Sequence, residues 1–243
     1  MFVWIAVAVG LIVGSFLNAL LFRFNTGKSV MRGRSACMHC GHELSALDLV
    51  PVFSFIFLRG HCRYCRAKIS WQYPLVEATA AALAGLIFLQ HQEPLLFAYW
   101  FLVWMTLLFI VVYDLRHQII PWSASLTLLA LALVYAFLMG TWWGALLGVP
   151  LLLLSLVSGG RWMGWGDGFL EISLGLLLGL TAGLTALFVA FWSGALIGVV
   201  LLLVSKNRYT MRSEVPFAPF LILGCAVAYF LHVDIFSYLP LLF

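Results

Sequence analysis

Charged residues are scarce in this sequence. Only 9% of its 243 residues are Asp, Glu, Lys or Arg, whereas 64% are hydrophobic and the mean hydropathy is +1.08. Soluble globular domains carry about 25% charged residues, so this composition excludes that class. The sequence also lacks low-complexity segments and any internal repeat of the kind that suggests an inverted-repeat transporter. We therefore expect an all-α polytopic membrane protein.

The apolar residues form eight runs, near residues 2–22, 74–90, 95–113, 122–139, 141–158, 168–182, 184–204 and 216–233. Because a membrane helix needs about 20 apolar residues, with a lower limit near 17, we predict about eight transmembrane helices. Gly140 and Gly183 mark joints that could instead be re-entrant turns. The first run has no basic segment before it and no clear small-residue cleavage site, so we predict a retained helix and not a signal peptide. Within it, Ser15 and Asn18 are predicted to serve helix packing.

The basic residues predict the orientation. The first loop holds eight of the thirteen, which are Arg23, Lys28, Arg32, Arg34, Arg59, Arg63, Arg66 and Lys68. The other five are Arg116, Arg161, Lys206, Arg208 and Arg212. With eight spans and the N-terminus outside, all thirteen fall on one side of the membrane, which the positive-inside rule identifies as the cytoplasm. The C-terminus is then also outside.

Residues 23–73 form the only sizeable polar segment. It contains two knuckles, Cys37-Met38-His39-Cys40 and Cys62-Arg63-Tyr64-Cys65. This spacing is typical of a four-cysteine zinc site, and the cytoplasm disfavours the alternative of two disulfides. We predict a closed structural zinc site on these four cysteines, without His39, His42 or His61 as ligands. The expected organisation is a first helix over residues 1–22, a cytoplasmic zinc-binding loop over 23–73 and a helical core over 74–243, in which Cys225 is a small buried apolar residue.

Two carboxylates, Asp114 and Asp167, are predicted to lie at the cytoplasmic membrane edge. An acid within a membrane helix costs about 2.5–3.5 kcal/mol and normally marks a functional site. If folding brings the two together around a water molecule, they share one proton, and the ionised partner can act as the base in peptide hydrolysis. Asp167 lies among Gly164, Gly166 and Gly168, which we expect to form a hinge that lets the backbone approach a substrate.

Other interpretations remain open. Asp114 could instead pair with Arg116 or His117, and Asp167 could merely cap the following helix. Glu77 and Glu171 are further acids at membrane edges and could be structural. A proton-coupled transporter with a zinc-stapled loop is an alternative function, although its acids would be expected nearer the midplane. A membrane scaffold whose zinc loop recruits partners is another. The sequence has neither a His-Glu-x-x-His zinc helix nor a Gly-x-Ser-x-Gly elbow.

The combination of motifs resembles the type IV prepilin peptidases, bacterial intramembrane aspartic proteases with a Gly-x-Gly-Asp motif. Six blocks match in order: Gly14-Ser15-Phe16-Leu17-Asn18 followed by Arg23; the paired knuckles, with Cys40-Gly41-His42-Glu43 after the first; Tyr73-Pro74-Leu75-Val76-Glu77; Asp114 with Ile120-Pro121; Gly164-Trp165-Gly166-Asp167; and Pro216-Phe217-Ala218-Pro219-Phe220. Together the blocks cover nearly the whole chain.

The resemblance implies cleavage of the short basic leader of prepilins or pseudopilins at the cytoplasmic face of the bacterial inner membrane. Asp114 and Asp167 match the catalytic aspartates of the family. Many members also methylate the new N-terminus with S-adenosylmethionine, and Gly60 matches a glycine associated with that activity. The implied partners are prepilins and the lipid bilayer, not nucleic acid.

The sequence departs from the family pattern at two places. Phe169 replaces a Lys that usually follows the second aspartate by two residues, and Trp122 replaces an Asp that commonly follows Ile-Pro. Loss of the Lys removes a cation that could hold Asp167 ionised or bind a substrate carbonyl.

Overall fold

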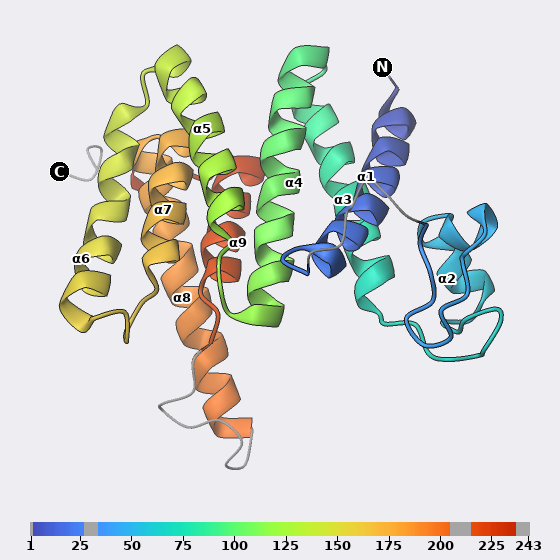
Figure 1. Ribbon diagram of the computed structural model, residues 1–243. Helices are drawn as coiled ribbons and strands as arrows, with labels where there is room; N and C mark the ends of the chain where they lie inside the picture. The colour runs from blue at the N-terminus through green and yellow to red at the C-terminus, as the bar shows by residue number, and fades with distance from the viewer. Residues whose placement is uncertain (1, 27–33, 205–214, 237–243) are drawn as a thin grey trace. The chain divides into compact units, whose positions relative to one another are not determined.

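The computed structural model describes residues 2–26, 34–204 and 215–236 (Figure 1). Over these residues the secondary structure is helical, with two isolated β-bridges and no strand. The elements are α1 (Val3–Arg23), η1 (Ala46–Leu49), α2 (Phe53–Phe57), α3 (Gln72–Gln90), α4 (Pro94–His117), α5 (Trp122–Met139), η2 (Trp142–Leu147), α6 (Gly148–Ser158), α7 (Trp165–Leu178), α8 (Leu180–Val204) and α9 (Ala218–Leu231). The chain divides into two compact units, Met1–Phe109 and Ile110–Phe243.

In the first unit, α1 packs closely on α3 because small residues line the contact. A Cβ atom on Gly10 would lie 2.6 Å from the Ala80 carbonyl oxygen, and one on Gly14 would lie 2.8 Å from the Glu77 Cα. Polar side chains join the same helices, since the Asn18 amide donates to the Tyr73 carbonyl over 3.1 Å. The predicted packing role of Asn18 is therefore confirmed, and the arrangement is typical of membrane helix pairs.

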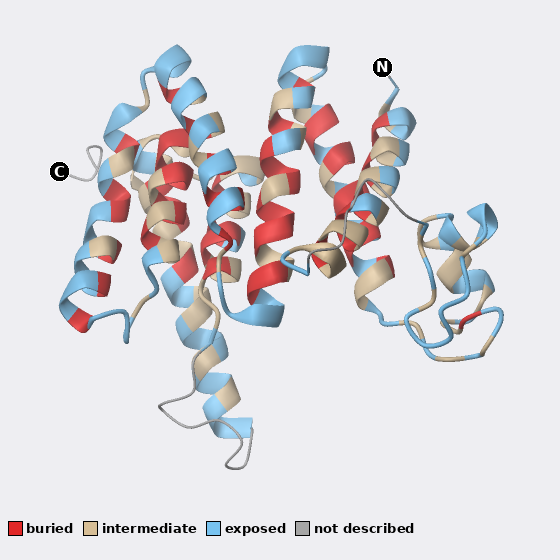
Figure 2. Cartoon of the chain, viewed as in Figure 1, coloured by how far each residue is buried: buried red, intermediate tan, exposed pale blue. Residues whose placement is uncertain are grey.

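The cysteine loop connects α1 to α3 and contains two knuckles of the same construction. In the first, the Cys37 N–H donates to the His42 carbonyl over 2.9 Å, and in the second the Cys62 N–H donates to the Ala67 carbonyl over 2.8 Å. Each knuckle turns at a residue with positive φ, Gly41 in the first and Arg66 in the second. Most of the loop is exposed (Figure 2).

In the second unit, α7 is the central helix. It contacts α5, α6, η2, α8 and α9, and its buried residues include Leu170, Glu171 and Leu174. Gly144 of η2 and Gly175 of α7 meet backbone to backbone, which leaves no room for a side chain on either residue. The C-terminal half of α8, by contrast, is largely exposed (Figure 2).

Helical structure covers all eight predicted runs, with two corrections. The run 141–158 is not one helix, because it begins with the 3₁₀ turn η2. The break between helices expected at Gly183 lies at Gly179, whose φ of +80° suits glycine. Gly183 lies inside α8, where the absence of a side chain makes room for Leu147. Gly140 ends α5 with a φ of +75°.

Five helices are long and apolar enough to cross a membrane, namely α1, α3, α4, α5 and α8, and η2–α6 and α9 are shorter apolar segments. The count of eight spans and the orientation therefore stay predictions. Five of the basic residues on which the orientation rests, Lys28, Arg32, Lys206, Arg208 and Arg212, lie outside the described residues.

Candidate functional site

Asp167 lies in the first turn of α7. The helix begins after Gly164, whose backbone is extended, with φ −71° and ψ 148°. The Gly164 N–H donates to Asp167 Oδ2 over 3.2 Å, so a local contact fixes the helix start. This is the capping role that a structural interpretation predicts, and an acid in the first turn also suits the positive end of the helix dipole. The side chain is half-buried.

Asp114 lies in the last turn of α4 and is only 4% exposed. Its carboxylate accepts a hydrogen bond from the backbone N–H of Ala218, the first residue of α9, while Oδ2 has no hydrogen-bond partner among the described residues. An ion pair of Asp114 with Arg116 or His117 stays an alternative interpretation of this acid.

The two aspartates are brought together by contacts of their neighbours. Ile120, just after α4, packs against Gly166, where a Cβ atom would lie 3.0 Å from the Ile120 Cβ. The carboxylates are close enough that the charge of Asp114 acts on Asp167. The end of α4 and the beginnings of α7 and α9 thus converge on a site with two acids.

The expected glycine hinge is wrong for Gly166 and Gly168, whereas Gly164 is extended and lies outside the helix. Gly166 and Gly168 lie inside α7 with negative φ, and the absent side chains admit neighbouring parts of the protein. A Cβ atom on Gly168 would lie 2.5 Å from Leu152 Cδ2 of α6, just as one on Gly166 would crowd Ile120. These glycines serve close packing because the start of α7 is wedged between two segments.

A third acid, Glu171, lies in α7 one turn beyond Asp167. Glu171 is 1% exposed, and its Oε1 has no hydrogen-bond partner among the described residues. Buried carboxyls without partners are expensive and uncommon. From the sequence we noted Glu171 only as an acid at a membrane edge. Its spacing of four residues from Asp167 is the signal that predicts both acids on one helix face.

Trp122 and Phe169, the two residues that depart from the family pattern, contact each other. The rings of Trp122 and Phe169 meet edge to face, with centroids 5.3 Å apart and planes at 62°. The first turn of α5 and the second turn of α7 are joined there by an aromatic pair. The two departures from the family pattern therefore lie at one place in the structure.

The four knuckle cysteines form a candidate metal centre. All four are free thiols, and their sulfur atoms lie within 4.8 Å of one another, with 3.8 Å between those of Cys37 and Cys65. Zn–S bonds of about 2.3 Å in a tetrahedron place the sulfurs about 3.8 Å apart, so the cluster fits zinc. The backbone N–H groups of Cys40 and His39 lower the pKa of the Cys37 thiol to about 6. At Cys65 the Ala67 N–H lowers the pKa, but burial and the other three thiols outweigh it and raise the pKa to about 11, so without metal one thiol of the cluster ionises most readily.

Histidines do not join the cluster. His42 instead packs on the Tyr64 ring, with centroids 3.7 Å apart, and His61 Nδ1 is 2.7 Å from the Arg59 carbonyl oxygen. Cys225 is buried in α9, as predicted.

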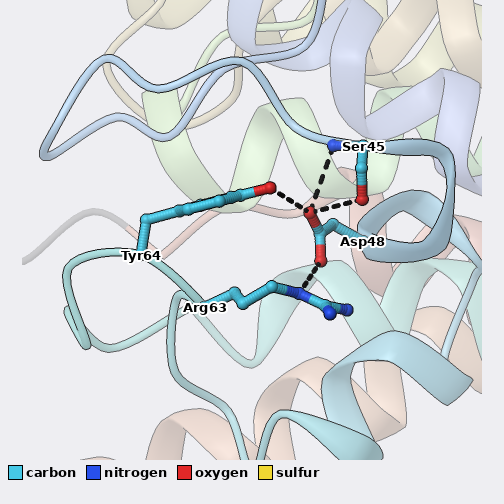
Figure 3. Close-up of polar contacts among 4 residues, drawn as sticks. All are labelled: Ser45, Asp48, Arg63 and Tyr64. Carbon is cyan, nitrogen blue, oxygen red and sulfur yellow. Dashed lines mark hydrogen bonds and ion pairs between the residues drawn. The ribbon is translucent and has the colours of Figure 1, made fainter.

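Asp48 clamps the second knuckle, a role that the sequence analysis missed (Figure 3). Its Oδ1 accepts a hydrogen bond from Arg63 Nε over 2.7 Å, and its Oδ2 accepts one from the Tyr64 hydroxyl over 3.3 Å. The Ser45 N–H and hydroxyl also donate to Oδ2. Burial by itself raises the pKa of Asp48, but the hydrogen bonds from Ser45 and Arg63 and the arginine charge outweigh it, so the pKa is lowered. Because Arg63 and Tyr64 stand between Cys62 and Cys65, this acid orients two predicted ligands.

Gly60 ends the turn that follows α2. Its φ is +71°, its N–H donates to the Phe55 carbonyl over 2.9 Å, and its carbonyl accepts from the Ile69 N–H over 2.8 Å. The conformation favours glycine for a structural reason. A role in methylation stays a prediction.

Comparisons with known proteins agree with the motifs. A family model described as "Bacterial Peptidase A24 N-terminal domain" matches residues 8–91, and one described as "Type IV leader peptidase family" matches residues 100–199. The chain is 30% identical to the prepilin leader peptidase/N-methyltransferase of Stutzerimonas stutzeri, over 93% of this chain and 90% of that protein. It is 31% identical to the protein of the same name in Bacillus subtilis, over 94% of both chains, and 33% identical to that of Burkholderia pseudomallei. No solved structure matches.

Proposed function

Because the chain belongs to the type IV leader peptidase family, and is thus a multi-pass membrane protease that processes prepilins, we propose that Asp114 and Asp167 are its catalytic pair. The observation that carries this proposal is the convergence of both acids at one place in the second unit, where the charge of one acts on the other. A transporter has no comparable support, since both matched families are peptidases.

The chemistry follows from one shared proton. Two carboxylates at close range cannot both ionise, so the ionised partner removes a proton from water while the other donates its proton to the scissile carbonyl oxygen. The resulting diol collapses, the C–N bond breaks, and the leaving amine takes up the proton that the base received. The shared proton belongs to the pair as a whole. In this scheme the Ala218 N–H orients the Asp114 carboxylate from one side.

Cleavage of a model prepilin by the full chain in liposomes tests the pair. Asp114→Asn and Asp167→Asn preserve side-chain size and remove the acid, so each should lower the cleavage rate by about 10²–10⁴-fold. Asp234→Asn is a matched control, because Asp234 accepts a hydrogen bond from Thr181 away from the aspartate pair. Cleavage that survives either substitution in folded protein would contradict the proposal.

We further propose that Cys37, Cys40, Cys62 and Cys65 hold structural zinc. Four protein thiolates fill the tetrahedron and leave no position for substrate, so zinc would shape the loop and take no part in hydrolysis.

N-methylation with S-adenosylmethionine is a second proposed activity, which rests on the relatives' names and on Gly60. If it is present, the cleaved product should gain the mass of one methyl group in place of hydrogen when S-adenosylmethionine is supplied. An unchanged mass beside normal cleavage would remove this activity and leave the peptidase intact.

The proposed location is the bacterial inner membrane, with the aspartates and the cysteine loop facing the cytoplasm. The distribution of the basic residues in the sequence supports this orientation. Alkaline phosphatase fused after the last residue should then be active, because that end is predicted to lie outside. An inactive phosphatase together with a fluorescent cytoplasmic reporter at the same position would overturn the orientation.

A further inference from the structure

The short helix α2 exposes an apolar face although it lies in the polar loop. Phe53, Ile56 and Phe57 recur at the i, i+3 and i+4 spacing of one helix face, and they are 54%, 63% and 83% exposed. We call these three residues the α2 face. Exposed apolar side chains gathered in this way mark a surface that contacts another apolar phase or molecule.

The loop is attached to the start of a candidate membrane helix. The Val52 N–H, directly before α2, donates to Glu77 Oε2 over 2.7 Å, and Glu77 lies in the second turn of α3, one of the candidate membrane spans. Just before α3, the Trp71 ring packs on Phe55 with centroids 4.9 Å apart. The α2 helix therefore lies beside the first turns of α3 and not beyond its end (Figure 1).

The backbone at this attachment is constrained. Val52 has φ 63° and ψ −49°, a conformation that a β-branched residue adopts only where surrounding contacts impose it. Glu77 is buried and also bonds the Ser15 hydroxyl of α1, so its carboxylate joins two membrane helices to the loop. The depth of α2 relative to α1 and α3 is thus set within the first unit.

The surroundings of the α2 face are basic. Residues 34–71 contain five Arg or Lys and two acids, a net charge of +3 from these side chains, which becomes +1 when the four thiolates and the zinc ion of the proposed metal centre are counted. Both acids are already paired, Glu43 with Arg34 and Asp48 with Arg63. Among the described residues, Arg59, Arg66 and Lys68 have no ion pair, and Arg59 follows α2 by two residues.

We propose that the α2 face inserts into the headgroup–acyl boundary of the protein's own membrane, with Arg59 and its basic neighbours on anionic phospholipid headgroups. A short apolar helix face beside basic residues is the composition that binds such an interface. The attachment to the second turn of α3 holds α2 beside the start of a candidate membrane span, which is the position that such an insertion requires. A basic prepilin leader is a poor alternative ligand, because like charges repel.

Photo-crosslinking in liposomes tests this contact. Benzoylphenylalanine replaces Phe57 in one variant and Met38 in the control, since Met38 is 79% exposed on the same loop but belongs to the first knuckle. In phosphatidylglycerol–phosphatidylethanolamine liposomes, we expect a phospholipid adduct at position 57 in about tenfold excess over position 38. Equal yields at the two positions, or no lipid adduct at 57, would overturn the proposal. So would an adduct with an added prepilin in place of lipid.

Two further variants keep the test decisive. If the label at 57 impairs the loop, as judged by metal content, the label is moved to Ile56, which shares the face. Arg59→Gln should reduce the share of phosphatidylglycerol among the adducts, and an unchanged share would overturn the headgroup contact. All measurements are made in the Asp114→Asn background, so the outcome is independent of peptidase activity.

Discussion

The cysteine loop and the aspartate site are built in opposite ways. The loop is largely exposed, and side-chain bonds hold it together, namely the Asp48 clamp and the cluster of thiols. The aspartate site is made by backbone packing, in which Gly166 admits Ile120 and the α9 N-terminus reaches Asp114. From this difference we expect that removing a metal ligand or a charge disrupts the loop. Adding a methyl group to a packed glycine should instead disrupt the aspartate site.

The largest effect is expected from removing metal ligands. Cys37→Ser combined with Cys62→Ser should abolish zinc binding, which contributes about 10–16 kcal/mol to the folding of small zinc domains. The loop should then become sensitive to protease while the helices of the second unit stay resistant. Metal analysis with limited proteolysis measures both. Wild-type protein without zinc, or a double variant that retains it, would show that the thiols serve another purpose.

A methyl group on Gly166 should damage the aspartate site alone. The Cβ of Gly166→Ala would lie 3.0 Å from the Ile120 Cβ, so the start of α7 must shift relative to the end of α4. Because a misplacement of about 1 Å can cost about 10²-fold, we expect prepilin cleavage to fall by about 10–100-fold with bound zinc unchanged.

The matched control is Gly198→Ala in α8, where an added Cβ would meet no atom within 4 Å. Equal cleavage rates in the two variants would mean that the contact between Gly166 and Ile120 does not set the distance between the aspartates.

Removing the Asp48 charge should loosen the loop and leave the aspartate site alone. Hydrogen bonds to charged groups contribute about 1.5–3 kcal/mol, so Asp48→Asn should lower the zinc affinity of the full chain. The control is Glu43→Gln, whose exposed ion pair with Arg34 is expected to contribute at most about 1 kcal/mol. Zinc competition with a chelator measures the zinc affinity of both variants, and Asp48→Asn should bind zinc more weakly than Glu43→Gln. Similar affinities would contradict the role of Asp48 in holding the second knuckle.

The Asp48 effect should also depend on pH. The pKa of Asp48 is lowered in the folded loop, so its stabilising contribution is fully present above the unfolded value of about 3.9 and is lost as the pH falls through the lowered value. The stability difference between wild type and Asp48→Asn should therefore shrink on acidification. A difference that grows in acid would show that Asp48 is not held ionised by Ser45 and Arg63.

The smallest effect concerns the pair of Trp122 and Phe169. Aromatic pairs contribute about 0.5–1.5 kcal/mol beyond their buried area, so a double-mutant cycle with Leu at both positions should give a coupling of that size in thermal stability. Introducing the family residues together, Trp122→Asp with Phe169→Lys, should cost less stability than the sum of the two single changes. Additive costs would mean that the two departures are independent.

Sequence reasoning succeeded where the information is local. The knuckle spacing predicted that four thiols would gather, and the apolar runs predicted the helices to within a few residues, except at Gly179 and η2. The motif around Asp167 was interpreted as a candidate site, which stays a prediction, and its glycines were assigned to a hinge although Gly166 and Gly168 serve packing. Close packing and flexibility both require glycine, so the residue type alone could not distinguish them.

The amino-acid sequence by itself determined the membrane class, the family, the four thiols and the two acids, because composition, spacing and motif order are properties of the chain. Only the tertiary structure decided that Ala218 holds Asp114, that Ile120 fills the space beside Gly166, that Asp48 clamps Arg63 and that Trp122 meets Phe169. Each of these contacts joins residues from different segments. Which distant residues meet is decided by how the helices pack, and no local pattern encodes that.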